Sequence, residues 1–211
     1  MHVQTSRTDT ADRMLDLAER LVQTRGFNGF SYADIASALD VTKASLHYHF
    51  PTKAELGRRL IERYSDAFTS ALVALDESGV GALDKLRAYV EIYAGVLRNE
   101  RMCLCGMLAA DYATLPEPMK SAVTHFFEVN ERWLAAVLEQ GRVAGELHFA
   151  GPPLEVARLL VSSLEGAMLV ARSFNEVSRF QWIADRLLTD LSGAESVSPG
   201  ARSIENPHPV G

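Results

Sequence analysis

Hydrophobic residues recur every three to four positions along most of the chain, which is the spacing of a helix buried on one side. The first such stripe begins near Thr8 and ends at Gly26, a residue suited to a helix C-terminus. Further stripes cover residues 32–39, 43–50, 53–76, 82–98, 117–143, 153–172 and 179–191. A shorter helical fragment surrounds Gly106, and no segment has a convincing strand pattern. We therefore expect an all-α protein.

Three helix starts follow one another closely after Phe30. Ser31 can cap the first, and Asp34 stands three residues later, where a carboxylate meets exposed backbone N–H groups and a positive helix end. Thr42 can cap the second helix, and Thr52 with Glu55 forms a capping box for the third. Two short helices separated by a tight turn and followed by a longer helix indicate a helix-turn-helix.

The second of these helices is predicted to bury Leu46 and Phe50 and to expose a polar outer face. That face carries cationic, hydroxyl, imidazole and phenol groups, which are donors suited to phosphates and base edges. It consists of Lys43, Ser45, His47, Tyr48 and His49. The pattern is typical of a recognition helix that reads DNA.

This stretch resembles the DNA-binding end of the TetR family of bacterial transcriptional regulators. The positions that fit the family pattern are Val41, Thr42, Ala44, Ser45, Leu46, His49, Phe50 and Lys53. His47 departs from it, because the family most often has a tyrosine there, so the aromatic phosphate contact shifts to Tyr48 or passes to an imidazole. The specific resemblance covers about the first third of the chain. It implies DNA contacts from Thr42, Lys43, Ala44, Ser45, His47, Tyr48, His49 and Lys53, the last on a phosphate.

The resemblance also implies two domains and a dimer. A three-helix DNA-binding domain would occupy residues 1–52, and a helical ligand-binding and dimerisation domain residues 53–192, with its last two helices at the dimer interface. The expected partners are a pseudo-palindromic operator in double-stranded DNA, a second copy of the chain and a small-molecule effector. Residues 193–211 are poor in hydrophobic residues and rich in Pro, Gly and Ser, which predicts a disordered tail.

The hydrophobic pattern supports this division independently. The stripe of the helix 53–76 is longer than a DNA-binding core needs, so its second half must bury against later helices. The helix 153–172 is apolar on more than one face, which predicts burial in a core or against a second subunit. The surplus apolar surface assigned to a dimer interface includes Leu160, Leu164, Gly166 and Leu187.

The net charge of −6 is unevenly distributed. Residues 1–64 hold 9 Lys and Arg against 8 Asp and Glu, a balance of +1, whereas residues 65–211 hold 12 against 19, a balance of −7. This asymmetry would orient the molecule on DNA, although a plain acidic protein fits the charge as well. No apolar run approaches the roughly 20 residues that span a bilayer, and the N-terminus lacks a signal-peptide core. We expect a cytoplasmic protein without a membrane partner.

Catalytic motifs are missing from the sequence. It contains no Walker loop, no G-x-S-x-G and no H-E-x-x-H. His47 and His49 stand two residues apart on a helix and diverge by about 200°, so they are unsuited to gripping one metal ion. We therefore expect neither an enzyme nor a bound cofactor or metal.

Candidate ligand contacts lie where aromatic and methionine side chains gather in the second part of the chain. They are Tyr93, Met102, Met107, Phe126, Trp133 and Met168. Ordinary core packing is the simpler interpretation of each one, because aromatic and methionine residues at helical spacing usually form a core.

Cys103 and Cys105 allow two interpretations and provide no disulfide framework. As soft apolar residues they can fill space beneath the core, which we favour. Alternatively, a place before a helix N-terminus with Arg101 close by favours the thiolate, as a sensor of oxidants or electrophiles requires. The main hypothesis is a repressor released by a ligand. The alternatives are a thiol-based repressor and a helical ligand-binding protein that has lost DNA binding.

Overall fold

The computed structural model describes residues 3–193, and every regular element in that range is a helix. The α-helices are α1 (Val3–Arg25), α2 (Tyr32–Leu39), α3 (Lys43–His49), α4 (Lys53–Glu77), α5 (Ala82–Arg98), α6 (Leu104–Ala110), α7 (Glu117–Ala144), α8 (Pro153–Phe174) and α9 (Val177–Ser192). Two short 3-10 turns, η1 (Phe27–Gly29) and η2 (Tyr112–Thr114), follow α1 and α6. The predicted all-α class is confirmed.

The helix boundaries follow the hydrophobic stripes closely, with one exception. The first helix begins at Val3 instead of near Thr8, so it includes polar residues that carry no apolar stripe. The predicted disordered tail lies, from residue 194 onward, outside the described residues.

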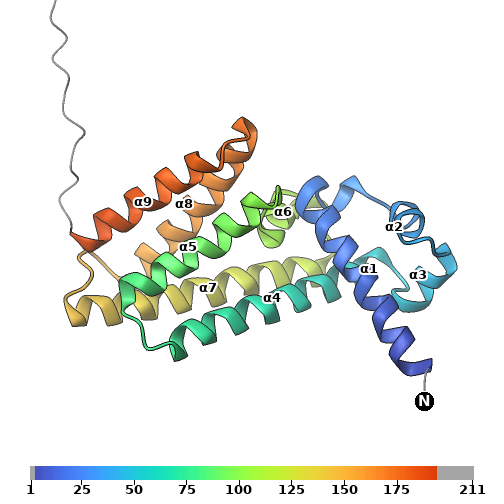
Figure 1. Ribbon diagram of the computed structural model, residues 1–211, viewed down its shortest axis with the longest axis horizontal. Helices are drawn as coiled ribbons and strands as arrows, with labels where there is room; N and C mark the ends of the chain where they lie inside the picture. The colour runs from blue at the N-terminus through green and yellow to red at the C-terminus, as the bar shows by residue number, and fades with distance from the viewer. Residues whose placement is uncertain (1–2, 194–211) are drawn as a thin grey trace, which may run out of the picture.

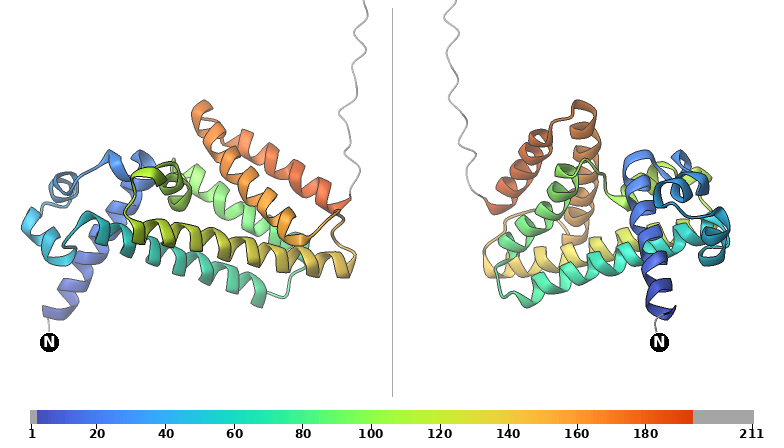
Figure 2. Two further views of the ribbon diagram at one scale, coloured as in Figure 1. Left: turned by 180° about the vertical axis from the view of Figure 1, so that it is seen from behind. Right: turned by 45° about the vertical axis from the view of Figure 1, so that its right-hand side comes forward.

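Figure 1 shows α1, α2 and α3 gathered at one end of the molecule and α5, α7, α8 and α9 at the other. α4 starts among the first group and runs beside α7 through the second, as both views of Figure 2 show. α8 and α9 form a hairpin that packs on α7 and α5. α4 therefore links the two groups, as its long apolar stripe predicts.

The N-terminal helices share a small core. Met14 of α1, Ile35 of α2 and Leu46 of α3 are fully buried in it. Phe27 and Phe30 close the core, and their rings meet edge to face with centroids 6.2 Å apart. α2 and α3 have 8 and 7 residues, too few to be stable alone in water, so this shared burial holds them in place.

Phe68 of α4 is the centre of an aromatic cluster in the larger part of the molecule. Its ring centroid lies 6.0 Å from that of Tyr89, 6.2 Å from that of Tyr93 and 5.2 Å from that of Phe126. The Tyr89 hydroxyl donates to Asn130 Oδ1 at 3.1 Å and lies 3.2 Å from the Tyr93 hydroxyl, so these buried groups are hydrogen-bonded. The far half of α4 is thus buried against α5 and α7.

Candidate nucleic-acid interface

The turn between α2 and α3 is held by local hydrogen bonds. Asp40 ends α2 in a left-handed conformation (φ 53°), which aspartate tolerates better than most residues. Thr42 Oγ1 accepts from the Ser45 N–H at 3.2 Å and so caps α3. The Tyr32 hydroxyl of α2 donates to the Phe50 carbonyl at 2.8 Å, which joins the two helices beyond the turn. Burial, reinforced by the charge of Glu55, raises the pKa of Tyr32 to about 12, so it remains a donor.

Most of the predicted DNA contacts on α3 face outward. Tyr48 is 64% exposed, and its ring meets that of His49 edge to face. His47 is exposed but turned towards α2, because Nδ1 lies 3.2 Å from the Pro51 carbonyl and the ring packs on Tyr32. Thr42, Lys43 and Ala44 are also exposed, while Ser45 and His49 are half-buried.

Lys53, which we predicted to contact a phosphate, is also hydrogen-bonded within the protein. Its Nζ donates to the carbonyl oxygens of Phe27 and Phe30, each at 2.5 Å, and lies over both rings. Burial lowers the pKa of Lys53, with Asp111 and Asp34 acting in the opposite direction. Two of the three ammonium hydrogens are therefore used within the protein, and Lys53 fastens the α1–α2 connection to α4.

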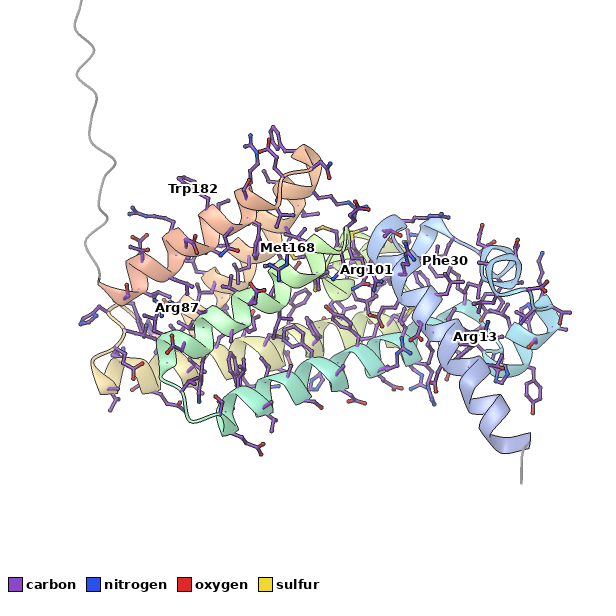
Figure 3. The ribbon with its side chains drawn as sticks, in the orientation of Figure 1. Arg13, Phe30, Arg87, Arg101, Met168 and Trp182 are labelled. Atoms are coloured by element: carbon purple, nitrogen blue, oxygen red, sulfur yellow. The ribbon has the colours of Figure 1, made fainter. Side chains whose placement is uncertain are left out.

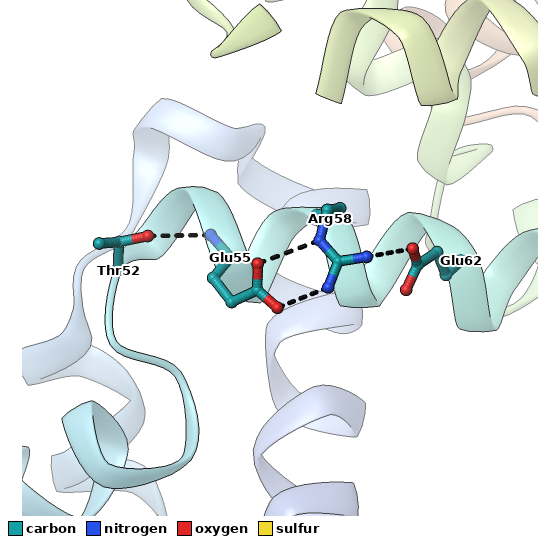
Figure 4. Close-up of polar contacts among 4 residues, drawn as sticks. All are labelled: Thr52, Glu55, Arg58 and Glu62. Carbon is teal, nitrogen blue, oxygen red and sulfur yellow. Dashed lines mark hydrogen bonds and ion pairs between the residues drawn. The ribbon is translucent and has the colours of Figure 1, made fainter. Parts of the chain in front are cut away.

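The start of α4 is stabilised by a cap and a run of ion pairs (Figure 4). Thr52 Oγ1 accepts from the Glu55 N–H at 3.1 Å, but the Glu55 carboxylate does not complete the expected capping box. It binds Arg58 through Nε at 3.0 Å and Nη2 at 2.6 Å, and Arg58 also pairs with Glu62. Arg58 is consequently occupied within α4.

The N-terminal helices are hydrogen-bonded to the rest of the chain at the end of α1. Asp111, just after α6, accepts from the Phe27 N–H at 2.8 Å. Arg172, near the end of α8, donates to the Thr24 carbonyl at 2.5 Å. The Met102 N–H donates to the Gln23 carbonyl at 3.2 Å. The end of α1 is therefore joined directly to α8 and to the residues that precede and follow α6.

The predicted ligand residues belong to one hydrophobic core, with Met107 and Trp133 partly buried against it. Tyr93 and Phe126 belong to the aromatic cluster around Phe68. Trp133 lies at the edge of this cluster. Its ring stacks on that of Tyr89, with centroids 5.6 Å apart, and its Nε1–H donates to Asp76 at 2.9 Å.

The three methionines belong to the same hydrophobic core or pack against it. Met102 and Met168 are buried core residues, as the simpler interpretation predicts. Met107 is half-buried, and its Sδ lies 3.7 Å from Nη1 of Arg172. It therefore belongs to the contact between α6, α8 and α1.

The cysteine pair contradicts the electrostatic premise of a thiolate sensor. Cys103 and Cys105 are 2% and 0% exposed. Burial first, and then the charge of Glu165, raise the pKa of both thiols well above the usual range. Cys103 Sγ accepts from the Gly106 N–H at 3.4 Å and caps α6. The expectation that Arg101 and the helix terminus favour a thiolate is wrong, because burial dominates.

Tyr64 and Glu165 are absent from the site residues predicted above, yet they face the cysteines. The Tyr64 hydroxyl donates to Cys103 Sγ at 3.8 Å, and the charge of Glu165 helps to raise the pKa of the same thiol. Burial raises the pKa of Glu165 to about 7. The available signal in the sequence was a lone acid within the apolar stretch from Leu164 to Val170.

An apolar strip remains exposed on the α8–α9 hairpin. Four of its side chains come from α8 and one from α9, and each is about half exposed or more. We call it the α8–α9 face; it consists of Leu159, Leu169, Val170, Phe174 and Trp182. Figure 3 shows Trp182 pointing away from the rest of the molecule. Such a strip favours a protein partner.

Burial on α8 shows that part of the predicted dimer interface is wrong. Leu160 and Leu164 are buried within the chain, at 5% and 1% exposure, and so belong to its own core. Gly166 does face outward, because a Cβ atom built there would meet nothing within 4 Å. Leu187 is half-buried. Among the helices of residues 3–193, none is long and apolar enough to cross a membrane.

Family profiles match both parts of the chain. The profile described as bacterial regulatory proteins, tetR family, matches residues 14–60, which include all of α2 and α3. The profile described as tetracyclin repressor-like, C-terminal domain, matches residues 82–187.

Individual relatives match along most of the chain. The HTH-type transcriptional repressor NemR of Escherichia coli (strain K12) is 31% identical over 176 residues, covering 79% of this chain and 87% of NemR. The HTH-type transcriptional repressor DhaR of Mycobacterium sp. (strain GP1) is 22% identical, covering 95% of this chain and 98% of DhaR.

Solved structures share the fold. A TetR-family transcriptional regulator from Agrobacterium tumefaciens has a TM-score of 0.85 at 31% identity, covering 88% of this chain and 99% of that one. The reduced form of E. coli NemR has a TM-score of 0.76 at 27% identity, covering 85% of this chain and 95% of NemR.

Proposed function

The chain belongs to the TetR family of bacterial regulatory proteins, and from this premise we propose a repressor that binds its operator as a homodimer and is released by a small molecule. Family membership makes the chain a DNA-binding transcriptional regulator and not an enzyme. We place the boundary between the DNA-binding and ligand-binding domains at the start of α4, residue 53.

The outward face of α3 is the observation that carries this proposal. Lys43 and Tyr48 are exposed there, while Leu46 is fully buried and anchors the helix. We assign base contacts to the N-terminal part of α3 and a phosphate contact to Tyr48. The proposed set is Thr42, Lys43, Ala44, Ser45, His47, Tyr48 and His49. Lys53 is left out of it because of its carbonyl partners.

A homodimer follows from the shortness of α3. A helix of 7 residues offers few base contacts, and two copies about 34 Å apart would double them on a pseudo-palindromic operator. The α8–α9 face supplies the exposed apolar surface that such a dimer needs. The open position of Gly166 on that face allows close approach of a second copy.

Release would pass from the aromatic cluster to α3 through α4 and α1. α4 starts directly after α3, and its Phe68 lies in the cluster. Asp111 and Arg172 fasten the end of α1 to α6 and α8. A ligand that prefers a conformer with displaced α3 helices shifts the population towards it, and a coupling of about 1–3 kcal/mol corresponds to about 5–150-fold weaker DNA binding. The site of action would be the cytoplasm, where bacterial DNA is found.

The experiment is a footprint on the DNA upstream of the chain's own gene, with a scrambled fragment of equal length and composition as control. We expect protection of two symmetric half-sites and an affinity at least about 1,000-fold above that for scrambled DNA at the same salt concentration. Equal affinity for both fragments would contradict the proposed function.

A further inference from the structure

Glu165 places a carboxyl group in the interior of the proposed ligand-binding domain. It lies on α8, and its Oε1 is inaccessible to solvent and has no hydrogen-bond partner within the described residues. The residue as a whole is half-buried, because its aliphatic base lies nearer the surface than its carboxyl group. A buried carboxyl oxygen without a partner costs free energy, so its retention calls for an explanation.

The surroundings of this carboxyl group are aromatic and thiol groups. The carboxyl group lies against Gly106, whose N–H donates to Cys103 Sγ at 3.4 Å, and the Tyr64 hydroxyl donates to the same thiol. The Tyr64 ring lies 5.7 Å from that of Phe126, which joins the carboxyl group to the aromatic cluster. Gly106 allows the approach, because a Cβ atom there would stand 2.3 Å from Glu165 Oε2.

The charge balance around Glu165 is one-sided. Among the side chains of residues 10–193, no lysine or arginine forms an ion pair with Glu165, and burial raises its pKa to about 7. The site therefore offers a carboxylate and ring faces without a cation of its own. Ring faces attract cations through their quadrupole, and a carboxylate accepts charge-assisted hydrogen bonds from an ammonium group.

A surface cleft lies between α4 and α7. A cleft of about 200 Å³ there is lined by Ile61, Glu62, Ser65, Asp66, Thr69, Ala122, His125, Phe126, Val129 and Asn130. We call it the α4–α7 cleft. Phe126 forms its inner wall and belongs to the aromatic cluster on its other side. Asp66 adds an acidic group to its lining, which favours the approach of a cation, while Glu62 is paired with Arg58.

We propose that the effector is an apolar organic amine in its protonated form, whose ammonium group binds Glu165 and whose apolar part lies among the rings of Tyr64, Phe126 and Tyr93. This inference rests on the proposed function and names the ligand class. Binding would move the Phe126 side chain away from the α4–α7 cleft and separate α4 from α7. That movement is transmitted along α4 to α3.

The test measures binding to the full-length chain by calorimetry at pH 8 without DNA. The probes are 2-phenylethylamine, its neutral isostere 2-phenylethanol and the anion 3-phenylpropanoate. We expect the amine to bind more tightly than the alcohol, and Glu165→Gln to weaken the amine on the order of 10–100-fold while changing the alcohol less than about threefold. Glu155→Gln, an exposed acid on the same helix, is the matched control and should leave all three probes unchanged.

A second measurement needs no variant at Glu165. Between pH 6 and pH 8 the carboxyl group ionises, so the amine should bind the unaltered chain about tenfold more tightly at pH 8, while the alcohol should not change. The neighbouring thiols and phenols stay neutral in this range because burial raises their pKa. His125 lines the α4–α7 cleft, so the series is repeated with His125→Gln.

Equal affinity for amine and alcohol, or amine binding that Glu165→Gln leaves intact, would overturn the inference. Because these titrations contain no DNA, a wrong ligand class would leave the footprint unaffected. Failure of the footprint, in turn, would leave the result with the amine unaffected.

Discussion

The Arg172 guanidinium donates to the carbonyl oxygen of Thr24 at 2.5 Å, joining the last turn of α8 to the last turn of α1. The carbonyl groups that end a helix lack partners within it and carry partial negative charge, so a cation stabilises them. Arg172 also donates to the Gln23 carbonyl at 3.3 Å. Arg172 therefore joins α8, which carries most of the α8–α9 face, to the DNA-binding helices.

Replacing Arg172 is expected to weaken the coupling between effector binding and operator release more than it weakens DNA binding itself. In Arg172→Ala, the end of α1 loses its hydrogen bonds to α8 and keeps those to Met102 and Asp111, so effector binding moves the DNA-binding helices less. We expect operator affinity without effector to change less than threefold and the effector-induced loss of affinity to shrink about fivefold, roughly 1 kcal/mol of coupling. Fluorescence anisotropy with and without effector measures both. Arg87→Ala, which breaks only an exposed pair with Asp84, is the control, and a coupling unchanged in Arg172→Ala would refute this role.

Lys53 and Lys43 should differ in their effects on stability. Lys53→Ala leaves the carbonyl groups of Phe27 and Phe30 without their donor, which should lower the free energy of unfolding by about 2–4 kcal/mol. Lys43→Ala alters an exposed side chain and should change it by less than about 0.5 kcal/mol. Urea unfolding measures both. Equal stability of the two variants would show that the hydrogen bonds from Lys53 to the carbonyl groups contribute little to the free energy of unfolding.

The helices could be predicted because their signals are local. Ser31, Thr42 and Thr52 stand immediately before α2, α3 and α4, and apolar stripes cover the helices that follow. Local signals also placed the exposed side chains of α3, since Leu46 and the polar residues around it follow from helical spacing alone.

The sequence does not predict contacts that depend on distant residues. The carbonyl groups that bind Lys53 belong to residues 23 and 26 positions away, and nothing near Lys53 indicates them. Cys103 stands at a helix N-terminus, as expected, but the packing of other helices decides its pKa through burial. Leu160 faces α-helices of its own chain instead of a second copy, because an apolar helix does not reveal which of its faces remains open.

Stability should fall with rising pH because of Glu165. Burial raises its pKa from 4.5 to about 7, so the folded chain keeps a proton that the unfolded chain has released between these values. This contribution is fully present below about pH 4.5 and is lost as the pH rises through 7, a total of about 3 kcal/mol. In Glu165→Gln the loss is absent, so the variant should gain about 3 kcal/mol relative to the wild type between pH 5 and pH 8.

Urea unfolding of wild type, Glu165→Gln and the exposed control Glu155→Gln at pH 5 and pH 8 tests this expectation. Glu155→Gln should differ from the wild type by the same amount at both values. If the free energies of unfolding of Glu165→Gln and the wild type also differed by the same amount at pH 5 and pH 8, the carboxyl group would ionise freely in the folded chain.

Gly166→Arg should separate the dimer without unfolding the chain. A Cβ atom at this position meets nothing within 4 Å in one copy, so the fold has room for a side chain to start outward, whereas a second copy on the α8–α9 face would meet a desolvated charge. We expect sedimentation at micromolar concentration to give a dimer for the wild type and a monomer for Gly166→Arg, with unchanged helical circular dichroism. Val143→Arg, at a position 79% exposed on α7, should remain a dimer. A dimeric Gly166→Arg would place the interface elsewhere.

The most direct measurement is operator affinity as a function of salt concentration for wild type, Lys43→Ala and Tyr48→Ala, with Val73→Ala on the exposed side of α4 as control. If α3 reads the operator, each α3 variant binds about 5–150-fold more weakly at fixed salt, the cost of one lost contact of about 1–3 kcal/mol. Val73→Ala binds like the wild type. Operator affinity and salt dependence that stay at wild-type values in both folded α3 variants would contradict the assignment of α3 as the DNA-reading helix.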